Sequence, residues 1–344
     1  MEKLRFNFEA TGIGSVPFKD PLDACRLIFE TFPEIPFWPQ LPKVSFRENM
    51  YVQYSEHIPG VILDEGAKTI HINTKKAYDE IEAVYSKCIE NDVEFFGISA
   101  QYARGLHEFL KILASGGGSG LKFVKGQITG PISFALSLTD ENKRSVIYDK
   151  DLFEVIAKVL TMNAKWQIMK IKESFPNAII FIDEPYLVSI GTSYVSVDKK
   201  IVTEKLSELS SAIKDAGALS AIHCCGNTDW SMVLESGIDI LNFDAYNFTK
   251  EFLLYPGDIA GFLGKGGSVA WGMVPSGAEV ISESPDNLKA RLKGAIKELA
   301  AKGIAKDGIS SIVTPSCGVG SLDDDIAKKV FRSTKALSDI LKKD

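Results

Sequence analysis

The strongest constraint on the fold is a regular alternation of apolar strand-like runs and helical segments along most of the chain. Each run is continuously apolar, as expected for a parallel strand covered on both faces, and a segment with helical periodicity follows. The runs lie at 121–129, 178–183, 218–222, 239–244, 268–272 and 310–314, and the helical segments at 151–174, 198–216, 229–236, 286–302 and 322–342. Such alternation predicts an α/β fold built on a parallel sheet.

The N-terminal part adds two shorter strands and an excursion. One strand ends at Gly14-Ser15, and a second is expected around 36–38, within a segment that carries four prolines. The runs 61–64 and 69–72 flank a turn signal and predict a β-hairpin that projects from the main body. Further helices are expected at 21–31, 75–91 and 101–114. Strand and helix thus alternate about eight times, which favours a single (β/α)8 TIM barrel over residues 1–344, with an N-terminal β-hairpin excursion, over a doubly wound sheet.

Polar and metal-ligating residue types recur where successive strands end. Because the carboxyl ends of barrel strands meet at one face, these side chains are expected to share one mouth. They are Ser15, Asp183, His223, Cys225, Asp244, Trp271 and Cys317. Gly14-Ser15 would place amide and hydroxyl donors at the rim of a site, although a simple tight turn is an equal interpretation.

His223 and Cys225 form the most specific signal. Residues i and i+2 of a strand share a face, so an imidazole and a thiolate would stand side by side as half of a tetrahedral zinc site. The alternative is a buried histidine beside inert buried cysteines. Cys317 supplies a third candidate ligand, and Asp244 a fourth, weaker oxygen ligand. One nitrogen, two thiolates and one replaceable position describe a catalytic site, which could activate water or bind and deprotonate a substrate thiol. The sulfur-rich set favours the thiol.

Composition excludes several other classes of protein. The chain has 344 residues, of which 45% are hydrophobic, and a formal net charge of −6 spread along its length. No clustered basic face indicates a nucleic-acid partner, and no apolar run reaches the length of a membrane span. The N-terminus lacks the apolar core of a signal peptide, so a cytoplasmic location is expected. Five cysteines are too few for a disulfide framework in so long a chain.

Several motifs together resemble the catalytic barrel of the cobalamin-independent methionine synthases, within the uroporphyrinogen decarboxylase-like superfamily. The matches are collinear between residues 11 and 318: Ile13-Gly14-Ser15 with Pro17, Val124-Lys125-Gly126 with Thr129-Gly130-Pro131, Ile182-Asp183-Glu184-Pro185, His223-x-Cys225, the 239–244 strand, and Pro315-x-Cys317-Gly318. The resemblance implies zinc ligands at His223, Cys225 and Cys317, with Asp244 where the family has a glutamate. It also implies that Ser15 and Asp183 hold the carboxylate and amino group of homocysteine.

Two departures from that family shape the functional prediction. The chain has no room for the additional N-terminal barrel that takes part in folate binding, and it is similar to the short "core" methionine synthases, which take methyl groups from a corrinoid carrier. Two further glutamates of the family correspond to Ala100 or a neighbour and to Ser189. The His223-Cys224-Cys225-Gly226-Asn227 segment also resembles the zinc-dependent methylcobalamin:coenzyme M methyltransferases.

We therefore predict a zinc-dependent thiol methyltransferase. The expected donor is methylcobalamin or a related methylcorrinoid on a carrier protein that docks over the mouth, and the leading acceptor is homocysteine, with coenzyme M as the alternative. Trp271 would form an apolar wall for the donor, although a core position is equally compatible with a tryptophan. Two other classes stay open: a uroporphyrinogen decarboxylase-like enzyme, which would need basic groups for its carboxylated substrate, and a non-catalytic zinc- or corrinoid-binding protein.

Overall fold

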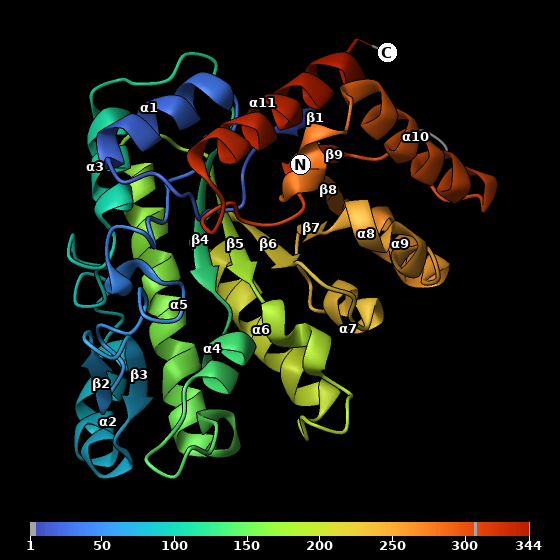
Figure 1. Cartoon of the computed structure of the whole chain (residues 1–344). Coiled ribbons are helices and arrows are strands. Elements are labelled where there is room, and N and C mark those ends of the chain that lie inside the picture. The colour runs from blue at the N-terminus through green and yellow to red at the C-terminus, as the bar shows by residue number, and fades with distance from the viewer. Residues whose placement is uncertain (1–4, 306–307, 344) are drawn as a thin grey trace.

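A curved parallel sheet forms the centre of the molecule. The computed structural model describes residues 5–305 and 308–343. Within these residues, seven parallel strands pair in the order β1-β9-β8-β7-β6-β5-β4. They are β1 (Asn7–Ala10), β4 (Val124–Thr129), β5 (Ala178–Asp183), β6 (Leu219–Cys224), β7 (Ile240–Phe243), β8 (Ser268–Val274) and β9 (Ser311–Pro315). Helices surround the curled sheet on its outer side (Figure 1). The fold is α/β and TIM-barrel-like, as the alternation predicted.

The predicted second strand is irregular, and here the architecture departs from an ideal (β/α)8 barrel. The segment around Pro36 lies between β1 and β4. Lys125 N donates to Pro36 O at 2.9 Å on one side, and Gln40 N donates to Gly14 O at 3.0 Å on the other. Only isolated parallel bridges form, at Phe37 to Lys125 and at Ser15 to Gln40. Proline lacks an N–H donor, so four prolines between residues 33 and 42 prevent a continuous ladder.

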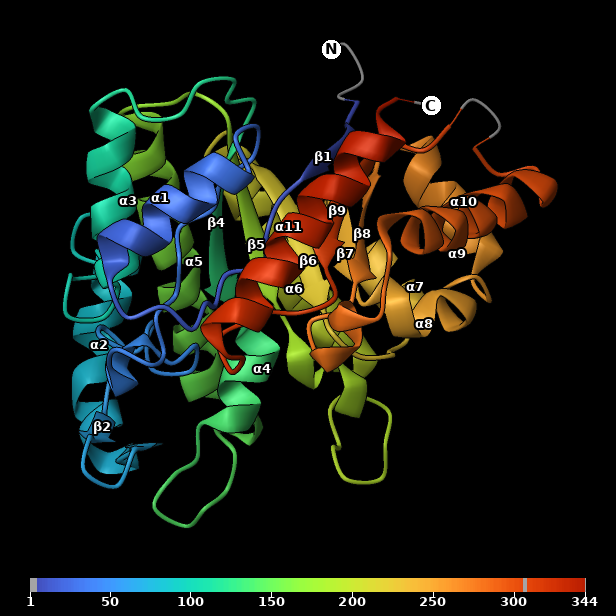
Figure 2. The same ribbon diagram turned by 45° about the horizontal axis from the view of Figure 1, so that its top comes forward.

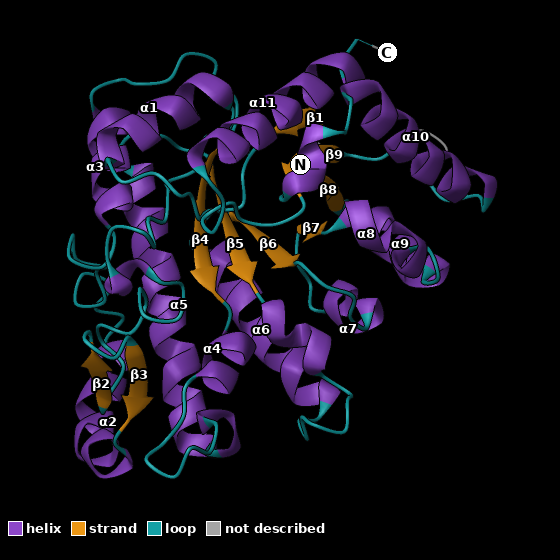
Figure 3. Cartoon of the chain, viewed as in Figure 1, coloured by secondary structure: helices purple, strands orange, loops and turns teal. Residues whose placement is uncertain are grey.

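Helices connect each strand to the next and cover the outer face of the sheet (Figure 3). They are α1 (Pro21–Thr31), α2 (Thr74–Ile89), α3 (Arg104–Ala114), α4 (Pro131–Ser137), α5 (Lys150–Lys172), α6 (Lys199–Asp215), α7 (Trp230–Glu235), α8 (Ala245–Phe252), α9 (Pro256–Gly264), α10 (Pro285–Ala301) and α11 (Asp324–Leu341). The start of α1 follows the expected chemistry, since the Asp20 side chain accepts from Asp23 N and Pro21 is the first helical residue. None of the helices in the described ranges is both long and apolar enough to cross a membrane.

The predicted hairpin is present as β2 (Val61–Asp64) and β3 (Thr69–Ile72), which pair antiparallel. Together with α2 it lies to one side of the barrel, at the lower left of Figure 1, and the turned view of Figure 2 shows the same separation. Ile72 N donates to Thr139 O at 2.9 Å, so the hairpin is attached beside the loop that follows α4.

Side chains alternate between the barrel interior and the helices, as the period of two in a strand requires. Phe181, Ala221 and Ala270 belong to a small interior cluster drawn largely from the strands. Trp271 has the opposite orientation and is fully buried in the outer core, where its ring centroid lies 5.8 Å from that of Phe243. The structure thus places Trp271 away from the mouth, contrary to the prediction, because the residue next to an inward-facing alanine must face outward.

Candidate metal centre

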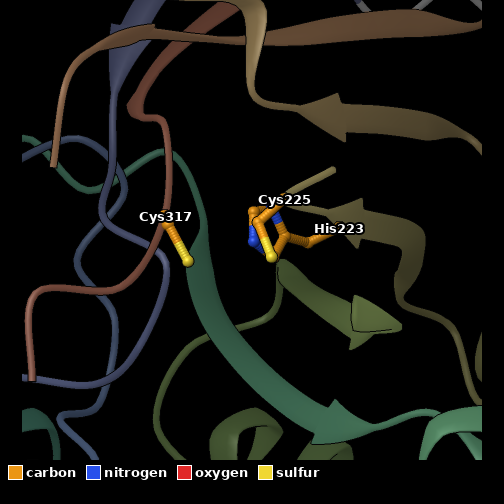
Figure 4. A group of neighbouring side chains, drawn as sticks. All are labelled: His223, Cys225 and Cys317. Carbon is orange, nitrogen blue, oxygen red and sulfur yellow. The ribbon is translucent and has the colours of Figure 1, made fainter. Parts of the chain in front are cut away.

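Three predicted ligands come together at the open end of the barrel. His223 is on β6, Cys225 directly follows the last residue of β6, and Cys317 lies in the loop after β9. Their ligand atoms all lie within 4.8 Å of one another. Figure 4 shows the Cys317 sulfur pointing toward the His223–Cys225 pair from a separate segment. Bonds of about 2.0–2.3 Å to a tetrahedral zinc ion hold ligand atoms roughly 3–4 Å apart, so the cluster has the scale of a zinc site.

The orientation of His223 is set by Asn242 on β7. Asn242 Nδ2 donates to Ala270 O at 2.7 Å and to Thr314 Oγ1 at 2.8 Å, which turns its amide oxygen toward the imidazole. Asn242 Oδ1 then lies 2.5 Å from His223 Nδ1 and accepts a hydrogen bond from its N–H. His223 Nε2 is buried and has no hydrogen-bond partner among the described residues. Nδ1 is thus the donor to Asn242, and Nε2 is the nitrogen that would bind a metal ion.

The two cysteines differ in acidity because they face each other. The Cys317 thiol beside it lowers the pKa of Cys225 to about 4, helped by His223 and opposed by burial. The same contact and burial raise the pKa of Cys317 well above its ordinary value. Burial alone would lower the pKa of His223, but the neighbouring Cys225 and Asp183 raise it overall. A thiolate, a thiol and an imidazole are thus packed together, a combination in which a soft divalent cation would replace the shared proton.

Asp244 directly follows β7, as predicted, and caps the next helix. Its Oδ1 accepts from Asn247 N at 2.9 Å, and its Oδ2 accepts from Asn247 Nδ2 at 2.7 Å, so the carboxylate is the N-cap of α8. Burial raises its pKa, with Cys225 also acting in that direction. It is near the cluster but is not among the described residues whose ligand atoms form it.

A cavity of about 300 Å³ opens onto the cluster. Its floor carries His223, Cys225, Cys317 and Asp183, and its walls come mainly from the N-terminal loops and the loop after β9. The remaining lining residues are Ile13, Ser15, Gln40, Pro42, Glu48, Asn49, Met50, Pro185, Gly318, Gly320 and Ser321. The described residues that line it include no lysine or arginine.

Asp183 ends β5 directly opposite His223 in the ladder. Its Oδ1 is buried without a hydrogen-bond partner among the described residues, which leaves a strong acceptor for a ligand. Burial raises the pKa of Asp183 to about 6, against the opposing effect of His223 and Lys125. Lys125 is fully buried; burial lowers its pKa to about 7, and Asp183 opposes this shift. Lys125 Nζ donates to Gln127 Oε1 at 3.2 Å and to Ile13 O.

Gly14 and Ser15 belong to the segment that follows β1. Ser15 lines the cavity, and its Oγ accepts from Gly320 N at 3.4 Å while its carbonyl accepts from Val319 N at 3.0 Å. Gly14 packs behind it, where an added Cβ would meet Gln40 Oε1 at 2.8 Å. A glycine is needed at 14 for close packing, whereas Ser15 holds the loop that carries Cys317.

Sequence reasoning missed several polar residues of the site. Asn242 and Lys125 lie within apolar strand runs, and Lys125 is part of a family motif without a role in the predicted site. Gln40 and Glu48 line the cavity from irregular segments without periodicity. Neither Ala100 nor Ser189, the positions matched to family glutamates, is among the described residues that line it. One sequence signal pointed to Asn242: it lies two residues before Asp244, so the two side chains are expected on the same face of the strand.

The comparisons with known proteins identify the fold. No model of a known protein family matches the sequence, and no curated protein matches it either. Among solved structures, the chain is similar to a B12-independent methionine synthase from Shewanella sp. W3-18-1, determined in complex with selenomethionine. The two are 15% identical, the TM-score is 0.60, and the match covers 98% of each chain. At this identity the likeness shows a methionine synthase-like fold, shared over nearly the full extent of both chains.

Proposed function

We propose that this chain is a zinc-dependent methyltransferase that acts on a thiol, with homocysteine as the acceptor and methionine as the product. The observation that carries the proposal is the His223, Cys225 and Cys317 cluster on the floor of the cavity. Zinc held by these residues would lower the pKa of an acceptor thiol and keep its sulfur nucleophilic at neutral pH. The methionine synthase-like fold supports an enzyme of this kind.

The residues of the chain have separate tasks in this proposal. Asn242 holds His223 so that Nε2 faces the ligand cluster. Asp183 accepts a hydrogen bond from the ammonium group of the acceptor through its unpartnered Oδ1. Ser15 and the neighbouring Gly318 loop face the acceptor from the wall of the cavity.

The charge of the cavity favours homocysteine over coenzyme M. A sulfonate needs cationic or multiple N–H donors, and the described lining residues include neither lysine nor arginine. An ammonium group suits the buried carboxylate of Asp183. The same absence of basic lining residues argues against a uroporphyrinogen decarboxylase-like reaction, whose substrate carries several carboxylates. A non-catalytic zinc-binding protein would need neither the cavity nor a replaceable ligand position.

The methyl donor is the part of the prediction that the comparison leaves without support. The sequence favoured a methylcorrinoid on a carrier protein, whereas the similar Shewanella protein is described as B12-independent. We therefore propose the acceptor chemistry first and treat the donor as a variable of the experiment. Methylcobalamin and 5-methyltetrahydrofolate represent the two classes.

The experiment measures zinc content and then methionine formation. Purified protein, loaded with zinc, is incubated with homocysteine or coenzyme M and with each donor in turn, and products are identified by mass spectrometry. We expect one zinc per chain and methionine from homocysteine with one donor class. Methylation of coenzyme M alone would replace the acceptor assignment. A protein that binds no zinc would overturn the proposal.

A further inference from the structure

We infer that His223, Cys225 and Cys317 are the complete set of protein ligands for zinc, and that Asp244 caps α8 and leaves the fourth position to the acceptor thiol. This inference rests on the proposed function, because it concerns the same site. The sequence analysis gave Asp244 as a weaker oxygen ligand at a replaceable fourth position, and the inference assigns that position to the acceptor alone.

Both oxygens of Asp244 are engaged by a single residue of the following helix. Asn247 donates its backbone N–H to Oδ1 at 2.9 Å and its side-chain amide to Oδ2 at 2.7 Å. Asp244 itself has a backbone φ of −69° and ψ of 84°, outside the helical region, as an N-cap residue does. These bonds serve the N-terminus of α8, whose first amides would lose this acceptor if the carboxylate moved away from Asn247.

The alternative oxygen ligands near the cluster are also committed elsewhere or out of reach. Asp183 lines the cavity, but its carboxylate is not part of the group of described ligand atoms that lie within 4.8 Å of one another. Glu184 follows it and faces away, where its carboxylate accepts from Ile132 N at 3.0 Å and Ser133 N at 2.8 Å. Three protein ligands with an open position form the usual pattern of a catalytic zinc site.

The consequence is a site that an acceptor enters without displacing a carboxylate. The junction between β7 and α8 can stay fixed, because Asp244 neither binds nor releases the metal. Aspartate, which is shorter than the glutamate of the resembled family, is suited to capping. It is among the best N-cap residues, and its side chain accepts from the amide three residues ahead.

The test compares substitutions at Asp244 with a matched cap elsewhere. Asp198 is the N-cap of α6 and accepts from Lys200 N at 2.8 Å, outside the described residues that line the cavity. Asp244→Asn, Asp244→Ala and Asp198→Ala are prepared with the wild-type chain. Zinc affinity is measured by competition with a chromophoric chelator, and the thermal midpoint is measured with and without zinc.

We expect Asp244→Asn to bind zinc within about threefold of wild type, since asparagine caps as well as aspartate and no metal ligand is lost. Asp244→Ala should lower the midpoint equally in the zinc-free and zinc-loaded protein, as Asp198→Ala does. A loss of more than about tenfold in zinc affinity in Asp244→Asn would overturn the inference and leave the methyltransferase proposal intact. Unchanged zinc affinity without methyl transfer to any thiol would leave the inference standing and remove the proposed function. A wild-type chain that does not bind zinc would overturn both.

Discussion

The two sides of the barrel are built on different principles. From β5 to β9 the strands pair in regular parallel ladders, and inward residues such as His223 and Asn242 face each other across one register. Between β1 and β4 the sheet is completed by the proline-rich segment around Pro36, with isolated bridges only. The first side supplies metal ligands, and the second supplies most of the cavity wall.

The difference shows how each side positions its functional groups. In the regular arc the backbone ladder fixes the direction of the strand side chains, and Asn242 adds the hydrogen bond that orients His223. In the proline-rich segment between β1 and β4, hydrogen bonds from side chains hold the backbone and the functional groups in place. Gln127 Nε2 donates to Trp38 O at 3.0 Å, Tyr54 OH donates to Gln127 O at 2.9 Å, and Gln40 Nε2 donates to Tyr54 OH at 3.2 Å. A buried polar network replaces the missing ladder bonds.

The largest effect should come from removing a ligand on the regular side. Cys317→Ser replaces a thiolate with a weakly acidic hydroxyl, so we expect zinc affinity to fall on the order of 100- to 1,000-fold and activity to be lost. Cys224→Ala is the matched control, because Cys224 faces the outer core and its Sγ contacts Gly226 O at 3.4 Å. Metal analysis of both purified variants checks this. Full zinc content in Cys317→Ser would remove Cys317 from the ligand set.

The second-largest effect concerns Asp183, which ends β5 and lines the cavity. Its pKa of about 6 in the folded protein lies above the value of about 3.9 expected in an unfolded chain. The folded state therefore holds the proton more tightly, and the free energy of unfolding falls as pH rises from about 4 to about 6. In the metal-free protein, Asp183→Asn should flatten this dependence, so its free energy of unfolding should rise relative to that of wild type as pH increases from 4 to 7.

Urea unfolding of zinc-free wild type and Asp183→Asn at both pH values measures that difference. Asp198→Asn, at an exposed helix cap, is the control and should follow wild type. If Asp183→Asn and wild type differ by the same amount at both pH values, burial does not control this carboxyl. The difference in the free energy of unfolding between Asp183→Asn and wild type would measure the stability that the chain loses by burying this hydrogen-bond acceptor.

The third effect tests the support behind His223. Asn242→Leu keeps the branched shape but removes the acceptor for Nδ1, so zinc affinity should fall about 10- to 100-fold, the usual size of such an outer contact. Asn242→Asp retains an oxygen facing Nδ1 and should keep most of the affinity. It loses the donor to Ala270 O and Thr314 Oγ1, which should destabilise the protein by about 1–3 kcal/mol. Equal zinc affinity in both variants would show that the ladder alone orients the imidazole.

The sequence predicted the regular side well and the closure poorly, for a physical reason. Parity along β6 was enough to place His223 and Cys225 together and to direct Cys224 outward. The same parity, applied to β8, would have placed Trp271 outside the barrel. The segment around Pro36 has no side-chain periodicity from which its inward residues could be predicted. Its prolines also lack the N–H donors that form a regular ladder. Its contributions, such as Gln40, depend on packing between segments far apart in the chain.

The smallest expected effect concerns the contact between Gly318, in the loop after β9, and Ser15, in the segment after β1. An added Cβ at Gly318 would lie 2.2 Å from Ser15 Oγ, so the loop that carries Cys317 packs directly on the segment that follows β1. Gly318→Ala should destabilise the protein by about 1–2 kcal/mol through this overlap. Ser15→Ala removes the oxygen, and the double variant should regain most of the loss. Denaturant unfolding of the four proteins gives the coupling energy. Strictly additive effects would mean that the loop shifts freely, in which case Ser15 does not position Cys317.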